Sequence, residues 1–156
     1  MKIRIIALGK IKENFLKEGI NEFLKRIKPY CPVEIDELNP IEIKDENLTQ
    51  KVLDEEGENI LSRIKPDSYV ITLEIQGKQL SSEEFASKIN EINISGVNDL
   101  VFVIGSSCGL SPKVSQRADF RLSVSKMTFL HQFARLILTE QIYRAFKILN
   151  GETYHK

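Results

Sequence analysis

The 156-residue sequence lacks the signals by which several classes of protein are recognised. Its apolar runs are all shorter than the ~18 residues that a membrane-spanning helix needs. Its short apolar N-terminus has no cleavage site of the kind that ends a signal peptide. Two cysteines occur, Cys31 and Cys108, with no CxxC pair and no histidine at metal-ligand spacing. We therefore expect reduced thiols, no bound metal ion and a cytoplasmic protein.

Common nucleotide-binding and hydrolase motifs are missing as well. No GxGxxG follows the first apolar segment, no GxxxxGK[ST] occurs, and no serine lies in a GxSxG elbow. These absences count against an ordinary NAD-binding domain, a P-loop NTPase and a Ser-His-Asp hydrolase.

The charge balances to zero overall but is unevenly distributed. Residues 113–156 contain 8 Lys and Arg against 3 Asp and Glu, so the C-terminal third is basic. A basic region on a neutral protein favours an anionic partner such as phosphate or RNA. The alternative is that these are ordinary solvent-exposed side chains on helix surfaces, without an anionic partner.

Apolar segments predict strands and helices in alternation. Apolar or β-branched runs predict strands over residues 2–9, 33–38, 69–75, 100–105 and 121–125. Spacing with a period near 3.6 predicts helices over residues 12–28, 47–65, 111–118 and 129–149, and one that starts at Ser81 or Ser82. This order predicts a single α/β domain over residues 1–156, with a mostly parallel sheet and helices on both faces.

Several local details follow from the same patterns. The run at 100–105 is the most apolar and is expected at the centre of the sheet. Gly77 predicts a turn after the strand at 69–75, and Ser81 or Ser82 can cap the helix that follows, with Glu84 or Glu83 in its first turn. In the helix at 47–65, Leu48 is expected to face inward together with Val52, Leu53, Ile60 and Leu61.

The final helix is apolar around much of its circumference, at Phe133, Leu136, Ile137, Ile142 and Phe146. Such a helix is either broadly buried or forms half of a dimer interface.

Three loops are candidates for a binding site, because ligands of open α/β sheets bind beyond the carboxyl ends of the strands. The first contains Leu73, Glu74, Gly77 and Lys78, the second is Gly105 to Gly109, and the third is Ser125 to Phe129. Their glycines allow tight turns and close approach of a ligand, although a single glycine often marks only a turn. Three such loops on neighbouring strands predict a pocket.

Both histidines lie in the last 26 residues. His131 and Arg135 share a helix face, where they suit phosphate binding or proton transfer. Tyr154, His155 and Lys156 combine an aromatic ring, an imidazole and a cation, which suits stacking on a nucleobase and contact with phosphate. The plainer readings are a helix-start residue for His131 and a loose terminus for the tail.

Five blocks of the sequence, in order and from end to end, are similar to those of one known family: IRIIALGK, ITLEIQGKQLSSEEFA, FVIGSSCGLS, LSVSKMTFLHQFARLILTEQIYRAFKI and GETYHK. With them the chain resembles the ribosomal RNA large-subunit methyltransferase H family of the SPOUT methyltransferases. The resemblance implies a C-terminal trefoil knot, a homodimer packed partly through the last helix, and S-adenosylmethionine (SAM) as cofactor. It also implies methylation of N3 of a pseudouridine in helix 69 of 23S rRNA, on assembled ribosomes.

The resemblance also implies roles for individual residues. The cofactor would be held by Leu73, Gly105, Val124, Ser125, Lys126, Met127, Thr128 and Phe129. The catalytic residues at the target nucleotide would be His131, Arg135, Tyr154 and His155. Of these, His155 or His131 would accept the N3 proton, and Tyr154 would stack on the base. Arg135 and Lys156 would hold phosphates.

The chain departs from the family pattern at three positions. The family usually has a second glycine where this chain has Ser106, a proline where it has Leu130, and other residues where it has Cys108. A serine holds a tight turn when its φ is negative, and loss of the proline frees the start of the last helix. We expect an active enzyme in which these changes act first on cofactor affinity.

Three other functions stay open on the sequence. One is a related knotted methyltransferase that acts on a ribose 2′-hydroxyl or another base. Another is a ribosome- or RNA-binding module without catalytic activity, which the changes at Ser106 and Leu130 would permit. The third is a generic nucleotide-binding α/β protein, against which the missing phosphate loop counts.

Overall fold

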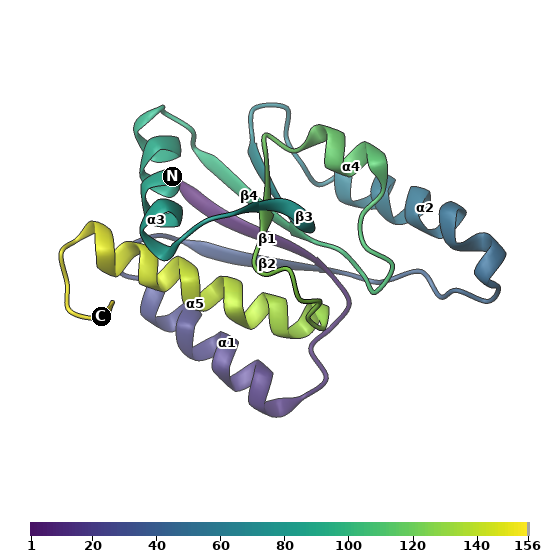
Figure 1. Ribbon diagram of the computed structural model, residues 1–156, viewed down its shortest axis with the longest axis horizontal. Coiled ribbons are helices and arrows are strands. Elements are labelled where there is room, and N and C mark those ends of the chain that lie inside the picture. The colour runs from purple at the N-terminus through teal and green to yellow at the C-terminus, as the bar shows by residue number, and fades with distance from the viewer. Residues whose placement is uncertain (156) are drawn as a thin grey trace.

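A computed structural model describes residues 1–155 (Figure 1). Five strands form one sheet in the order β2-β1-β4-β3-β5, and every neighbouring pair is parallel. Their bounds are β1 (Lys2–Leu8), β2 (Val33–Leu38), β3 (Tyr69–Gln79), β4 (Asp99–Ile104) and β5 (Phe120–Ser123). The predicted parallel α/β sheet is confirmed, and the most apolar strand, β4, lies at its centre with all six residues buried.

Helices cover both faces of the sheet, as predicted (Figure 1). One face packs against α1 (Asn14–Ile27), α3 (Ser82–Ile94) and α5 (His131–Leu149), and the other against α2 (Thr49–Leu61) and α4 (Pro112–Arg117). Neighbouring residues of β1 divide between the two cores: Ile5 packs with Ile142 of α5, and Ile6 packs with Ile60 of α2. This division follows from the two-residue period of a strand. Within the described residues no helix is both long and apolar enough to cross a membrane.

Of the two serines predicted as possible caps, Ser81 caps α3, in a capping box with Glu84. Glu84 donates its backbone N–H to Ser81 Oγ at 3.1 Å, and Ser81 donates its own N–H to Glu84 Oε2 at 2.7 Å. These bonds satisfy two of the backbone N–H groups that a helix start leaves unpaired. Phe85, Ile89 and Ile92 then form the buried stripe.

Several predicted element boundaries were wrong, among them three in α2 and α5. Leu48 is 45% exposed, because it lies in a short 3₁₀ turn (Glu46–Leu48) capped by Asp45, before α2 begins. Further along, α2 ends at Leu61 rather than at 65. The last helix begins at His131 rather than at 129, because Leu130 has extended backbone angles, with φ −55° and ψ 136°.

The predicted turn at Gly77 is instead part of β3. Leu122 of β5 pairs first with Leu73 and then with Lys78, so the chain between them leaves the ladder and returns. At Gly77 a Cβ atom would lie 2.7 Å from the carbonyl oxygen of Arg121. A glycine is therefore required here by the close approach of β5, not by a turn.

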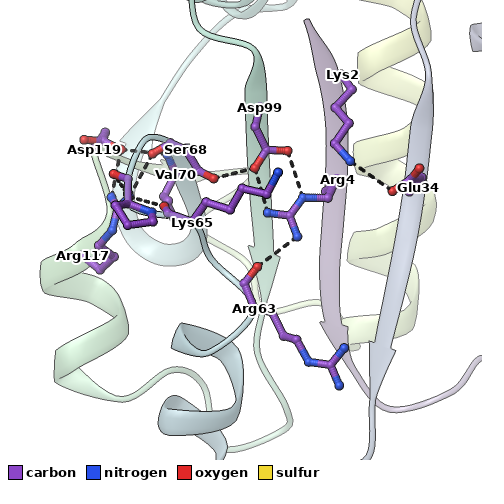
Figure 2. A network of polar contacts seen from close by, with 11 residues as sticks. Lys2, Arg4, Glu34, Arg63, Lys65, Ser68, Val70, Asp99, Arg117 and Asp119 are labelled. Atoms are coloured by element: carbon purple, nitrogen blue, oxygen red, sulfur yellow. Dashed lines mark hydrogen bonds and ion pairs between the residues drawn. The ribbon is translucent and has the colours of Figure 1, made fainter.

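A polar network ties the amino ends of the strands together (Figure 2). Arg4 of β1 donates to both carboxylate oxygens of Asp99 of β4, at 2.9 and 2.7 Å, and Ser68 donates to the same carboxylate at 2.5 Å. Nearby, Arg117 donates to the carbonyl oxygen of Ser68 at 2.9 Å, and Asp119 accepts from the backbone N–H of Val70 at 2.8 Å. Each of these polar groups has a partner within the network.

Candidate functional site

The first part of the site is the loop that follows β4, residues 105–111, which we call the β4 loop. At Gly105 a Cβ atom would lie 2.4 Å from the carbonyl oxygen of Gly109, so the loop folds back on its own start. Gly109 closes it with φ +85° and donates its N–H to the carbonyl oxygen of Ser106 at 3.0 Å. Among the described residues φ is positive only at glycines, so Ser106 fits this tight loop without strain.

The second part is the loop between β5 and α5, residues 124–130, which we call the β5 loop. Ser125 shapes it, because its Oγ accepts the backbone N–H of Met127 at 3.0 Å. Apolar side chains lie exposed along it, with Met127 at 73% and Leu130 at 68%. These apolar side chains are accessible on the loop and are available to contact a ligand or a partner.

The predicted cofactor residues lie on neighbouring strands. Leu73 of β3 pairs with Leu122 of β5, directly before the β5 loop, and Gly105 follows the central strand β4. A cavity of about 330 Å³ reaches Val124, while Leu73 and Gly105 lie outside its lining. The residues around it come from the start of α3 and the two residues before it, from β5 and the first residue of the β5 loop, and from α5: Leu80, Ser81, Ser82, Phe85, Leu122, Ser123, Val124, Ile137, Leu138 and Gln141.

Arg135 is a buried residue of α5, with 1% of its surface exposed. Its Nη1 donates to Glu37 Oε1 of β2 at 2.5 Å, and its Nη2 donates to the carbonyl oxygen of Gly9 at 2.8 Å. Its Nε has no hydrogen-bond partner among the described residues. Burial lowers the pKa of Arg135 below its ordinary value, against the opposing effect of Glu37. Arg135 also lines a cleft of about 490 Å³ between α1 and β2, together with Lys10 and Lys17.

His131 begins α5 and packs over Gly9 at the end of β1. A Cβ atom on Gly9 would lie 3.5 Å from His131 Nε2. Burial, and then the neighbouring Arg135 guanidinium, lower the pKa of His131 below its usual range. The imidazole is therefore uncharged near pH 7 and can accept a proton.

The C-terminal tail packs against α3 and α5. Tyr154 donates its hydroxyl to Glu140 Oε1 at 3.0 Å, and its ring meets Tyr143 edge-on with centroids 4.8 Å apart. Burial and this hydrogen bond raise the pKa of Tyr154. His155 Nε2 lies 2.8 Å from Glu83 Oε1 of α3, and its Nδ1 lies 3.3 Å from Arg144 Nη1. Lys156, predicted to hold phosphate, lies outside the described residues.

Within one chain the four predicted catalytic residues form two separate pairs. His131 and Arg135 lie in the first turns of α5, whereas His155 contacts Arg144, thirteen residues after His131. At a rise of 1.5 Å per residue, that interval spans about 20 Å along the helix. The structure thus brings together the members of each pair but does not bring the two pairs together.

Sequence analysis missed one buried polar residue beside the site. Glu56 of α2 is 2% exposed and accepts a hydrogen bond from Ser106 Oγ of the β4 loop at 2.9 Å. The available signal was its spacing, because Val52, Glu56 and Ile60 occur at i, i+4 and i+8 on one helix face. A carboxylate on an inward stripe requires a polar partner.

Cysteine and metal chemistry have little support in the described residues. No group of three or more His, Cys, Asp or Glu side chains within residues 1–155 is arranged to hold a metal ion. Cys31 is buried, and burial raises the pKa of its thiol. Cys108 is a free thiol in the β4 loop.

Comparisons with known proteins agree with this architecture. A family model described as a predicted SPOUT methyltransferase matches residues 1–155. The chain is 55% identical over 159 residues to the ribosomal RNA large subunit methyltransferase H of Carboxydothermus hydrogenoformans, and 54% over 160 residues to that of Clostridioides difficile. A putative protein of the same name from Methanococcus maripaludis is 51% identical over 164 residues. Each alignment covers both chains completely.

A solved structure shares the fold. It is described as a probable methylase family protein from Haemophilus influenzae Rd KW20, and it matches with a TM-score of 0.54 at 16% identity. The match covers 99% of this chain and 70% of that one. On the family model and the full-length relatives, this chain belongs to the SPOUT methyltransferases and, within them, to the ribosomal RNA large-subunit methyltransferase H family.

Proposed function

We propose that this protein is a SAM-dependent methyltransferase that methylates N3 of a pseudouridine in helix 69 of 23S rRNA. In this proposal one domain, residues 1–156, acts in the cytoplasm on assembled ribosomes. The observation that carries it is identity of 51–55% over the full length to relatives named as large-subunit rRNA methyltransferases. The basic C-terminal third is consistent with an RNA substrate.

The residues of the two loops fit the chemistry of the proposed cofactor. Its adenine needs apolar surface, for which the exposed Val124, Met127 and Phe129 are available. Its hydroxyl and amino-acid groups need polar partners, for which Ser125, Thr128 and Lys126 are present on the same loop. Leu73, within β3, and Gly105, directly after β4, complete the set.

When bound, the cofactor supplies an electrophilic methyl group on a sulfonium. The chain must hold the acceptor nitrogen about 3–3.5 Å from that methyl group, exclude water, and remove the proton that N3 carries. His131 is one candidate for proton removal, because an imidazole can accept a proton at its neutral nitrogen. Burial and the Arg135 charge lower its pKa and so oppose this protonation. His155 is the second candidate, and Tyr154 would stack on a base extruded from its helix.

A homodimer is part of the proposal, because one chain holds the catalytic residues as two distant pairs. Exposed apolar residues of α1 and α5 offer an interface: Phe15 is 58% exposed, and its ring lies 6.0 Å from that of Phe133. The exposed Leu130 extends this surface at the start of α5. Pairing two copies through α5 would allow the tail of one to approach His131 and Arg135 of the other.

A trefoil knot is also proposed for the C-terminal segment. It rests on membership of the SPOUT methyltransferases, whose family model matches residues 1–155. Pulling the folded chain from both ends tests it. A tightened knot would leave the stretched chain shorter than its contour length of about 3.3–3.6 Å per residue. A chain that reaches full length would exclude the knot.

Transfer of labelled methyl from SAM to ribosomes lacking the modification tests the function, with free 23S rRNA in parallel. Incorporation at pseudouridine N3 on ribosomes alone is the expected result. Incorporation at a ribose 2′-hydroxyl would instead support the related knotted enzyme. No incorporation on either substrate, by a folded protein, would support the binding module.

His155→Ala tests the place of the tail in catalysis. We expect unchanged SAM affinity and a loss of turnover of about 10²–10⁴-fold, the usual contribution of a general base. His131→Ala is the companion variant, since only one of the two imidazoles need accept the proton. Unchanged turnover in His155→Ala would remove His155 from the mechanism.

A further inference from the structure

Glu56 is a buried carboxylate whose two oxygens are both engaged by neutral donors. Oε1 accepts the backbone N–H of Ile41 at 3.0 Å, and Oε2 accepts the hydroxyl of Ser106 at 2.9 Å. Burying a carboxylate is costly unless its oxygens are hydrogen-bonded. These two bonds therefore fix the side chain between the segment after β2 and the β4 loop.

The next residue of α2 contacts the other end of the same loop. At Gly57 a Cβ atom would lie 2.3 Å from Ser111 Oγ, so α2 and the loop are in direct contact there. Ser111 in turn caps α4, because its Oγ accepts the N–H of Val114. Glu56 and Gly57 thus support the β4 loop near its beginning, at Ser106, and at its end, at Ser111.

The support acts on a loop with little internal freedom. Gly105 lies against the carbonyl of Gly109, and Ser106 and Gly109 form an isolated bridge. These internal contacts hold the loop residues together, so the position of the whole loop depends on its contacts with other segments of the chain. Ser106 is adjacent to Gly105, so a shift at Ser106 is passed directly to the backbone that would meet the cofactor.

We propose that Glu56 is a positioning residue, which acts through Ser106 to hold the β4 loop in its cofactor-binding arrangement. This inference rests on the proposed function, because it requires that SAM binds at Gly105. The physical basis is preorganisation: a loop already held in place loses less entropy when a ligand binds.

The test measures SAM affinity by calorimetry on the full-length protein, with thermal unfolding and methyl-transfer kinetics in parallel. Ser106→Ala removes the hydroxyl donor on the β4 loop, and Glu56→Ala removes the carboxylate acceptor on α2. We expect each to raise Kd and the KM for SAM about five- to tenfold, close to the loss of one hydrogen bond of ordinary strength. The kcat at saturating SAM should be unchanged.

Two further variants separate positioning from general stability. In Glu56→Gln the amide can accept from Ile41 and donate to Ser106 Oγ, so Kd should rise no more than about twofold, given that both contacts persist. Combining Glu56→Ala with Ser106→Ala should raise Kd no further than the larger single change, because both remove one interaction. Glu55→Gln, an exposed neighbour on α2, is the matched control and should change nothing.

The outcomes distinguish this proposal from the function on which it rests. Wild-type protein that fails to bind SAM would overturn both. Wild-type binding with an unchanged Kd in Ser106→Ala would overturn the positioning role alone. Ser106 is only half-buried, so this variant gives the decisive measurement even where Glu56→Ala fails to fold.

Discussion

The two ends of the parallel sheet use their polar groups differently. At the amino ends of the strands, Arg4, Ser68 and Asp99 satisfy one another across three segments of the chain (Figure 2). At the carboxyl ends, the β4 loop is held by close backbone contacts and by Glu56, and the β5 loop exposes apolar side chains. The amino end is thus closed by internal bonds, whereas the carboxyl end combines such bonds, at Arg135 and Glu56, with exposed apolar side chains on the β5 loop.

This difference separates stability from function within one small fold. A saturated polar network adds stability and leaves little capacity to bind anything else. Exposed apolar groups on a supported loop add little to stability, but they gain energy when a ligand or partner covers them. We therefore expect changes at the amino end to alter the free energy of unfolding, and changes at the carboxyl end to alter SAM affinity.

The largest expected effect is at the amino end, in Asp99→Asn. The Arg4 side chain is 12% exposed and would keep its charge without its partner carboxylate. Loss of one member of such a buried pair costs about 3 kcal/mol of unfolding free energy. Denaturant unfolding measures it, with the exposed Asp67→Asn as control, and SAM affinity of the folded protein should be unchanged. A weaker SAM affinity in Asp99→Asn would contradict the separation of stability from SAM binding between the two ends of the sheet.

The next effect is at the carboxyl end, in Gly105→Ala. The new methyl group would lie 2.4 Å from the carbonyl oxygen of Gly109, so the β4 loop must shift. We expect a rise in the Kd for SAM of about thirtyfold, near 2 kcal/mol, with a smaller change in unfolding free energy. Ser107→Ala, at an exposed position of the same loop, should bind as the wild type does. A variant that loses stability while retaining affinity would contradict the role given to this loop.

Acid should weaken the amino end selectively. The hydrogen bond from Arg4 is the main cause that lowers the pKa of Asp99 from 3.8 to about 2. Since the folded pKa is the lower one, protons bind more tightly to the unfolded chain, and the stabilisation is lost as pH falls from about 4 to about 2. The loss should be about 1–2 kcal/mol, allowing for screening by solvent. Unfolding curves of wild type and Asp99→Asn should converge over this range, and parallel curves would contradict the assignment.

Sequence patterns predicted the fold well, because they report burial along a short stretch. Contiguous β-branched runs marked the strands, and β4 was correctly placed at the centre. Gly77 was misread, because a glycine that permits close approach of another backbone looks the same as one in a turn. The backbone that approaches it, at Arg121 and Leu122, is more than forty residues away in the chain.

The site was less accessible from the sequence, because its contacts join distant residues. Nothing near Arg135 in the chain indicates that its guanidinium binds Glu37, 98 residues earlier, and the carbonyl of Gly9. Likewise, His131 and His155 both lie in the last 26 residues, but nothing in the sequence indicates that His155 contacts α5 at Arg144, far from His131. The predicted roles of these residues stay predictions, whereas their positions are now defined.

The smallest expected effect concerns Leu130, at the junction of the β5 loop and α5. Its φ of −55° is close to the value that a proline ring imposes, and its side chain is exposed. Leu130→Pro should therefore raise the unfolding free energy by about 0.4–1 kcal/mol, because it restricts the unfolded chain. By ordering the β5 loop, it should also tighten SAM binding by up to about twofold. Leu130→Ala removes the same side chain without fixing φ and should give neither gain. Destabilisation by proline would mean that the loop needs the freedom, or the backbone N–H, that leucine provides.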